Sequence, residues 1–167
     1  MNDQSSIRGH GVVMQPEDGP TYWQPVPANG HVEPKLYPSN THFDGLSMGY
    51  QTIAPASQVR KHSHEEQIEL LVCFGGRGRV VLDGESHDFV PGTVCFAGYD
   101  LTHEIINESP SEDLVLMWVI APAGLEDFFA TIGRPRTRGD AAPEPFPRPE
   151  SVVAIERDMG MNDTTAQ

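Results

Sequence analysis

The chain has 167 residues with 16 Gly and 15 Pro, a share that argues against a helical bundle because both residues destabilise helix interiors. Acidic side chains outnumber Lys and Arg by 24 to 11, and the net charge of −13 argues against nucleic acids and anionic membranes as partners. Cys73 and Cys95 lie in apolar stretches typical of buried free thiols, so we expect no disulfide framework. The N-terminus has no apolar signal core and no apolar run is long enough to span a membrane, so we expect a soluble, cytoplasmic protein.

Residues 1–40 contain many Gly and Pro residues and are expected to form an extended N-terminal arm with one or two short strands, such as Thr21–Trp23. The aromatic side chains of Tyr22, Trp23 and Tyr37 favour an arm that packs on the rest of the protein. A disordered tail is the alternative. Such an arm can also lay a strand on the sheet edge of a second subunit.

Residues 41–122 change to short apolar runs separated by turn residues. The dipeptide Asp83-Gly84 supplies the positive-φ positions of a two-residue hairpin turn, and Pro91-Gly92 marks the next turn. Strands are expected at Leu46–Ile53, Gln67–Phe74, Gly78–Leu82, Ser86–Val90, Thr93–Ala97, His103–Asn107 and Leu114–Ile120. Short strands with tight turns and no long helix between them predict an all-β, antiparallel sandwich or barrel.

Residues 123–167 combine a helical pattern with a Pro-rich stretch. Within Gly124–Gly133 the apolar residues are spaced at i, i+3, i+4 and i+7, which predicts a one-sided helix. Residues 134–149 form a Pro-rich linker, and Pro149–Met159 is expected to form a second short helix. We expect this C-terminal segment to pack on the barrel.

Four side chains have the chemistry of a metal site: His62, His64, Glu69 and His103. His62 and His64 are two residues apart, so on a strand both rings point to the same side. Three imidazoles and one carboxylate suit divalent first-row metal ions and leave two positions open in a roughly octahedral field. Singly, each residue has an ordinary alternative, such as a surface histidine or an exposed strand glutamate.

The first part of this stretch resembles the first motif of the cupin superfamily, G-x5-H-x-H-x3–4-E-x6-G. The chain has His62-x-His64-x4-Glu69-x6-Gly76, and Ala56 stands where the motif has its leading Gly. The second cupin motif has the form G-x5-P-x-G-x2-H-x3-N. The matching residues are Gly92-x5-Gly98-x-Asp100-x2-His103-x3-Asn107, with Gly98 in place of Pro and Asp100 in place of Gly. Both replacements in the second motif, Gly98 and Asp100, are turn formers, so we expect its turn to be kept.

The resemblance covers residues 45–120 and implies a single-domain β-barrel of jelly-roll type, open at one end, with a metal ion inside. It also implies that the four side chains named above are the metal ligands and that the protein is a homodimer. The resemblance favours Fe(II), and the ligand set also accepts Mn, Ni, Co or Zn.

The resemblance makes a metal-dependent dioxygenase of the quercetinase-like kind the leading hypothesis. Its substrate would be a small chelating molecule such as an enol, diketone, catechol or hydroxyketone, and Glu69 would act as the catalytic base if it leaves the metal. The alternatives are a metal-assisted isomerase, lyase or hydrolase on a small polar metabolite, or a non-catalytic small-molecule-binding protein.

Four further side chains are candidates for the substrate pocket: Tyr50, Gln51, Arg60 and Cys73. Tyr50 and Gln51 are neighbours on a strand, so only one of them faces inward. Arg60 shares strand parity with His62 and can bind a substrate carboxylate through two hydrogen bonds, with a surface position as the alternative. Cys73 either lines the cavity or packs in the core.

Overall fold

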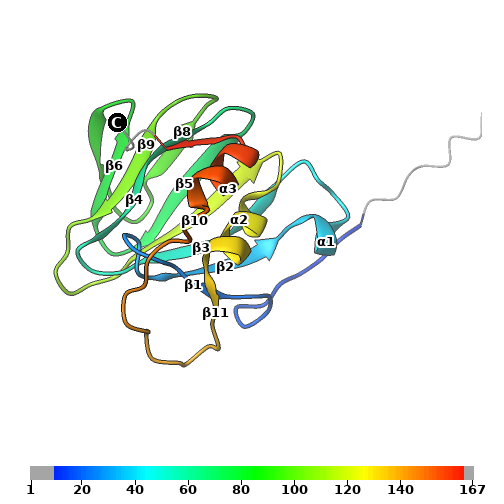
Figure 1. Ribbon diagram of the computed structural model, residues 1–167, viewed down its shortest axis with the longest axis horizontal. Coiled ribbons are helices and arrows are strands. Elements are labelled where there is room, and N and C mark those ends of the chain that lie inside the picture. The colour runs from blue at the N-terminus through cyan, green and yellow to red at the C-terminus, as the bar shows by residue number, and fades with distance from the viewer. Residues whose placement is uncertain (1–9, 164–167) are drawn as a thin grey trace, which may run out of the picture.

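The computed structural model describes residues 10–163, which form two antiparallel sheets that face each other as a jelly-roll barrel (Figure 1). The seven-stranded sheet has the order β11 (Arg134–Pro135), β1 (Tyr22–Trp23), β2 (His31–Leu36), β3 (Ser47–Ile53), β10 (Leu114–Ala121), β5 (Ile68–Gly75) and β8 (Val94–Ala97). The five-stranded sheet has the order β12 (Met161–Asp163), β4 (Ser57–His64), β9 (His103–Asn107), β6 (Gly78–Leu82) and β7 (Glu85–Phe89). The predicted all-β jelly-roll is confirmed.

The strands bury every second residue, because alternate side chains of a strand point to opposite faces. β10 buries its inward side chains fully: Leu114, Leu116, Trp118 and Ile120. β5 buries Glu69, Leu71 and Cys73 on one face. The inner faces of the two sheets meet in one hydrophobic cluster.

The turn between β6 and β7 confirms the predicted hairpin, since Asp83 and Gly84 have φ angles of +50° and +86° and Leu82 pairs with Glu85. β2 and β4 are absent from the predicted strands. β2 contains a proline and alternating charges, and β4 contains five polar side chains in a row between Arg60 and His64, so neither shows an apolar alternation.

The described part of the predicted 1–40 arm extends the seven-stranded sheet of its own chain, since β1 pairs with β2 and β11, and β2 pairs with β3. Residues 1–9 of the arm lie outside the described residues, as do residues 164–167 of the predicted tail. On β2, the Glu33 carboxylate lies 3.2 Å from Lys35 Nζ and 3.3 Å from Arg138 Nη2. Burial alone would raise the pKa of Glu33, but the hydrogen bonds and charges of these two partners lower it below its ordinary value.

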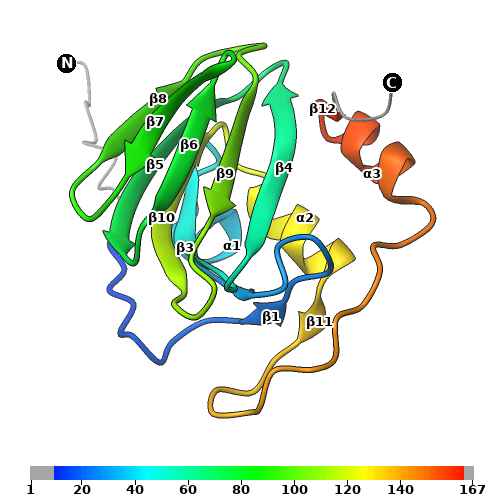
Figure 2. The same ribbon diagram turned by 90° about the vertical axis from the view of Figure 1, so that its left-hand side faces the viewer.

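Three helices lie outside the strands of the described chain: α1 (Pro38–Thr41), α2 (Leu125–Ile132) and α3 (Val152–Asp158). The last two confirm the predicted C-terminal helices, and Phe129 of α2 packs on Trp118 with ring centroids 5.6 Å apart. Figure 2 shows the long loop that leads from β11 to α3 and places β12 at the edge of β4. None of the helices among residues 10–163 has the length and apolar character needed to span a membrane.

Candidate metal centre

Three strands from both sheets bring the predicted ligands together. β4 supplies His62 and His64, β9 supplies His103, and β5 of the opposite sheet supplies Glu69. One ligand atom from each of the four side chains lies within 4.8 Å of the others. His64, Glu69 and His103 are at most 5% exposed, and His62 is partly buried. The spacing in the sequence thus becomes one compact cluster inside the barrel.

Backbone carbonyls orient two of the imidazole rings. His62 Nδ1 lies 2.8 Å from the carbonyl oxygen of Arg60, and His103 Nδ1 lies 3.1 Å from that of Leu101. A carbonyl oxygen only accepts, so each Nδ1 carries the proton and donates. This tautomer leaves the Nε2 lone pair of each ring for a metal ion.

The Glu69 carboxylate links the histidines. Its Oε2 lies 2.7 Å from His103 Nε2 and 3.4 Å from His64 Nε2, the latter contact without hydrogen-bond geometry. Both ring nitrogens of His64 are buried and have no hydrogen-bond partner in the described part of the chain. An octahedral ion with bonds of about 2.1 Å separates its ligand atoms by about 3.0–4.2 Å. The orphaned His64 ring and the gathering of all four ligand atoms within 4.8 Å of one another fit a divalent metal ion, which would give His64 Nε2 the partner it lacks.

Burial and mutual charge set the protonation of the cluster. Burial and the neighbouring His103 and His64 lower the pKa of His62 to about 3, so its ring is neutral. Burial would raise the pKa of Glu69, but the contacts with His103 and His64 lower it. Burial would lower the pKa of His103, but the hydrogen bond and charge of Glu69 raise it. The Glu69 carboxylate and the His103 ring therefore each stabilise the charged form of the other.

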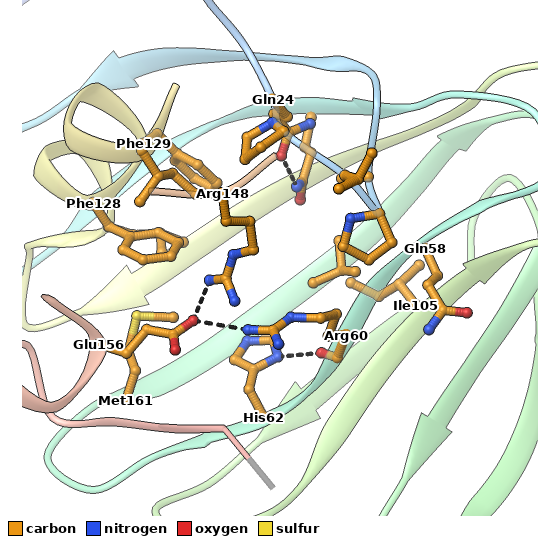
Figure 3. Close-up of a pocket in the computed structure, with 18 of the residues that line it drawn as sticks. Gln24, Gln58, Arg60, His62, Ile105, Phe128, Phe129, Arg148, Glu156 and Met161 are labelled. Carbon is orange, nitrogen blue, oxygen red and sulfur yellow. Dashed lines mark hydrogen bonds and ion pairs between the residues drawn. The ribbon is translucent and has the colours of Figure 1, made fainter. Parts of the chain in front are cut away.

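The cluster faces a cavity of about 670 Å³, a volume that includes its open mouth (Figure 3). His62 and Glu69 belong to the cavity lining. One wall is apolar and comes mainly from α2: Leu125, Phe128, Phe129 and Ile132. The polar lining comes from the arm, β3, β4 and the C-terminal segment: Gln24, Gln51, Gln58, Arg60, Arg148 and Glu156. The cavity can therefore hold a small molecule with both an apolar part and polar groups.

Of the four predicted pocket residues, the structure places Gln51 and Arg60 in the cavity lining. Strand alternation turns Gln51 inward, where it is 5% exposed, so its neighbour Tyr50 points outward and packs on Phe74 with ring centroids 5.8 Å apart. Cys73 is 2% exposed in the hydrophobic core, and burial raises the pKa of its thiol. Neither Tyr50 nor Cys73 lines the cavity.

Four polar residues of the cavity are not predicted from the sequence: Gln58 on β4, and three residues from the two ends of the chain, Gln24, Arg148 and Glu156. Gln24 lies in the arm and accepts a 2.6 Å hydrogen bond through its Oε1 from Gln51 Nε2. Arg148 lies in the Pro-rich linker and Glu156 in α3. No motif marks these positions, because they reach the cavity through long-range packing of both chain ends. The spacing of residues along the sequence does not indicate that these side chains lie near a cavity-facing strand residue such as Gln51.

Comparisons with known proteins give one family match and several similar folds. Residues 49–120 match the family described as "Cupin domain". KdgF from Halomonas sp. has a TM-score of 0.59 at 17% identity, over 70% of this chain and 98% of that one. A cupin-superfamily sugar phosphate isomerase from Silicibacter pomeroyi has a TM-score of 0.57 at 15% identity, over 66% and 75% of the two chains. No curated protein matches the sequence significantly.

A predicted oxalate decarboxylase from Thermotoga maritima has a TM-score of 0.57 at 26% identity, over 67% of this chain and 99% of that one. The strand order of the two sheets, the spacing of the two motifs and the similarity to these structures all indicate the same fold. The chain has the cupin fold, and residues 49–120, which match the cupin domain, carry a His/Glu cluster consistent with a divalent metal ion.

Proposed function

We propose that the protein is a metal-dependent enzyme and that its reaction is a dioxygenation of a small chelating molecule, as in quercetinase-like cupins. The observation that supports this proposal is the three-histidine, one-glutamate cluster whose His62 and Glu69 face the cavity. An enol, diketone, catechol or hydroxyketone would approach the two remaining positions from there. A divalent metal, with Fe(II) favoured and Mn, Ni, Co or Zn as alternatives, would supply positive charge that stabilises the deprotonated substrate.

The residues of the chain have three roles in this proposal. Glu69, which lies in the cavity lining, would accept the proton of the substrate hydroxyl if its carboxylate leaves the metal. Gln51, held by its hydrogen bond to Gln24, presents an amide that orients the substrate oxygens. The apolar wall formed by α2 excludes water from the deprotonated substrate.

The test is O2 uptake by protein loaded separately with Fe(II), Mn, Ni, Co or Zn. Substrates are 2,4-pentanedione, catechol and 2-hydroxyacetophenone, which share a chelating pair of oxygens. We expect metal-dependent uptake with at least one of them, abolished by His62→Ala and retained by His87→Ala, a change at an exposed histidine on β7. Absence of uptake with every combination of metal and substrate overturns the dioxygenase.

A lyase is the second candidate, and the 26% identity to the predicted oxalate decarboxylase of Thermotoga maritima favours it over the isomerase and hydrolase alternatives. Anaerobic incubation of each metal-loaded form with oxalate separates the two candidates. Formate and CO2 in the absence of O2 support the lyase, whereas O2-dependent turnover supports the dioxygenase. Tight binding without turnover in either experiment indicates a small-molecule-binding protein.

A further inference from the structure

Two buried glutamines form a directed chain of hydrogen bonds at one end of the cavity. Gln24 and Gln51 are each 5% exposed, and both line the cavity. Gln24 Nε2 donates to the backbone carbonyl oxygen of Thr52 at 3.2 Å, and Gln24 Oε1 accepts a 2.6 Å bond from Gln51 Nε2. Because a carbonyl oxygen only accepts, the Gln24 amide has a single orientation here, and it fixes the orientation of the Gln51 amide in turn.

This chain of bonds leaves one acceptor for a ligand, the side-chain oxygen of Gln51. No donor among residues 10–163 bonds this Oε1, and it is not among the enclosed polar side-chain atoms of these residues that lack a partner. It therefore borders the cavity that Gln51 lines. The Gln51 amide also keeps one N–H beyond its bond to Gln24, so a hydroxyl group suits it both as donor and as acceptor. An ether oxygen has no proton to donate and leaves Oε1 unpaired.

The register of the seven-stranded sheet places the Gln51 amide far from the predicted metal ligands. Gln51 pairs with Leu116 of β10, and Glu69 pairs with Ile120 of the same strand. Four residues along β10 and two strand spacings across the sheet separate their backbones by about 13 Å and about 10 Å, or about 16 Å on the diagonal. Side chains stand roughly perpendicular to a sheet, so they shorten this gap little.

A ligand that reaches both ends must be longer than catechol or a simple diketone. Figure 3 shows Gln24 and His62 on opposite sides of the cavity, and the apolar wall of α2 belongs to the same lining. The cavity volume of about 670 Å³, with its mouth, is large enough for a molecule of two rings. Such a ligand needs chelating oxygens at one end, an apolar body along α2 and a hydroxyl group at the other end.

We propose that Gln24 holds the Gln51 amide as a hydroxyl-binding subsite, which selects elongated chelating substrates with a hydroxyl group at the end remote from the metal ligands. The proposal rests on the proposed metal-dependent function and adds the chemical class of the substrate. Gln24 is a positioning residue in this subsite, because its amide bonds both Gln51 and the Thr52 carbonyl. It lies in the arm, outside the residues that match the cupin domain, so the arm contributes to the specificity of the cavity.

The first experiment compares three probes on Co(II)-loaded protein by isothermal titration. They are 4-phenylcatechol, 4-(4-hydroxyphenyl)catechol and 4-(4-methoxyphenyl)catechol, which share the chelating group and differ only at the distal end. We expect the hydroxyl probe to bind about 10-fold more tightly than either of the others, the range for one hydrogen bond to a buried acceptor. The phenyl probe separates hydrogen bonding from steric exclusion of the methoxy group. Equal binding of the hydroxyl and phenyl probes overturns the proposal.

Two variants separate the acceptor from its orientation. Gln51→Leu removes the acceptor and should abolish the preference for the hydroxyl probe. Gln24→Leu keeps the acceptor but frees the amide to rotate, so its N–H groups can face the cavity and the methoxy probe should gain affinity relative to the hydroxyl probe. A folded Gln51→Leu variant that keeps the preference overturns the subsite, and an unchanged ratio of the two probes in Gln24→Leu overturns the positioning role.

Gln67→Leu is the matched control for both variants. Gln67 Nε2 also donates to backbone carbonyl oxygens, those of Pro122 and Ala123. Gln67 lies outside the cavity lining, so its change should keep the preference for the hydroxyl probe. Loss of the preference in this control would mean that the effect of the other variants is not specific to the cavity, which overturns the proposal.

The second experiment separates failure of the subsite from failure of the metal-dependent function. Metal-free protein is titrated with 4-phenylphenol and with biphenyl, neither of which chelates, and binding is followed by the fluorescence of the probe. We expect 4-phenylphenol to bind about 10-fold more tightly, and Gln51→Leu to remove the difference. If Co(II) fails to bind, the proposed function fails, while this preference still decides the subsite. Thermal unfolding of every variant checks folding, and Gln24→Leu supplies the test should Gln51→Leu fail to fold.

Discussion

We expect Asn107, the last residue of the second cupin-like motif, to stabilise the fold and not to bind a metal ion or substrate. Its side chain is 1% exposed, and its Nδ2 lies 2.9 Å from each of three carbonyl oxygens, those of Ile53, Ala54 and Glu112. Its Oδ1 accepts a 3.1 Å hydrogen bond from the backbone N–H of Ser109. The amide thus ties the end of β9 to the end of β3 and to the loop that leads into β10.

The magnitude for Asn107→Ala follows from the number of bonds that the amide can make. Its two N–H groups are shared by the three carbonyl oxygens, so two donated bonds and one accepted bond are lost. At about 1 kcal/mol for each bond, the expected loss of unfolding free energy is about 3 kcal/mol. For a chain of this size the melting temperature should fall by roughly 6–12 °C. Asn107→Asp should be worse near neutral pH, because a buried carboxylate would face three carbonyl oxygens without a donor.

Differential scanning calorimetry of the two variants, with Asn162→Ala as control, measures these differences. Asn162 is exposed and donates one side-chain bond, 2.8 Å long, to Glu65, so its change should cost less than about 0.5 kcal/mol. Co(II) stoichiometry at low temperature should remain unchanged in Asn107→Ala, since the amide touches none of the predicted ligands. A melting temperature within 1–2 °C of the unmodified protein, or an Asp variant more stable than the Ala variant, would refute the reasoning about this amide.

Three further changes test the metal cluster, the packing and the charges. His64→Ala should reduce bound metal at micromolar concentration from about one to near zero per chain, as measured by elemental analysis, while the exposed His10→Ala should not. Gly49→Ala should lower the unfolding free energy measured in urea by about 2 kcal/mol or more, because a Cβ there would lie 2.6 Å from Trp118 Cζ2. The lowered pKa of Glu33 means that its contacts stabilise the fold above pH 4.5, its unfolded value, and that this stability is lost as pH falls through the lower folded pKa. Glu33→Gln should therefore lower the unfolding free energy by about 1 kcal/mol at pH 7, and this free energy should then fall less steeply as the pH is lowered below 4.5. An unchanged pH dependence of the unfolding free energy contradicts this account.

The sequence predicts the barrel and the cluster because both depend on short-range spacing. Alternation along β5 places Glu69 on the inner face, and two-residue spacing places His62 and His64 on one strand. Turn residues such as Asp83-Gly84 then fix where strands end. These signals act over a few residues, so one sequence is enough to read them.

The pocket is predicted less well because it is built by contacts between distant segments. Alternation shows that one of Tyr50 and Gln51 faces inward, but the choice depends on which face of β3 meets the other sheet. The polar strand β4 lacks an apolar alternation, and its hydrogen bonds to β9 and β12 hold it in the sheet. Arg148 and Glu156 reach the cavity only because the chain after β11 returns to β4.

The return of the chain to β4 couples the cavity to the ligand strand. β12 pairs with β4 in a register that places Met161 opposite His64, and Met161 itself lines the cavity. Without β12, β4 would be an open sheet edge, and an edge strand with unpaired backbone groups is less rigid. The segment that brings Glu156 and Arg148 to the cavity therefore also fixes the backbone that carries His62 and His64. The geometry at the predicted metal ligands and the polar lining of the cavity consequently depend on the same strand pairing, so a loss of the β12–β4 pair should disturb both together.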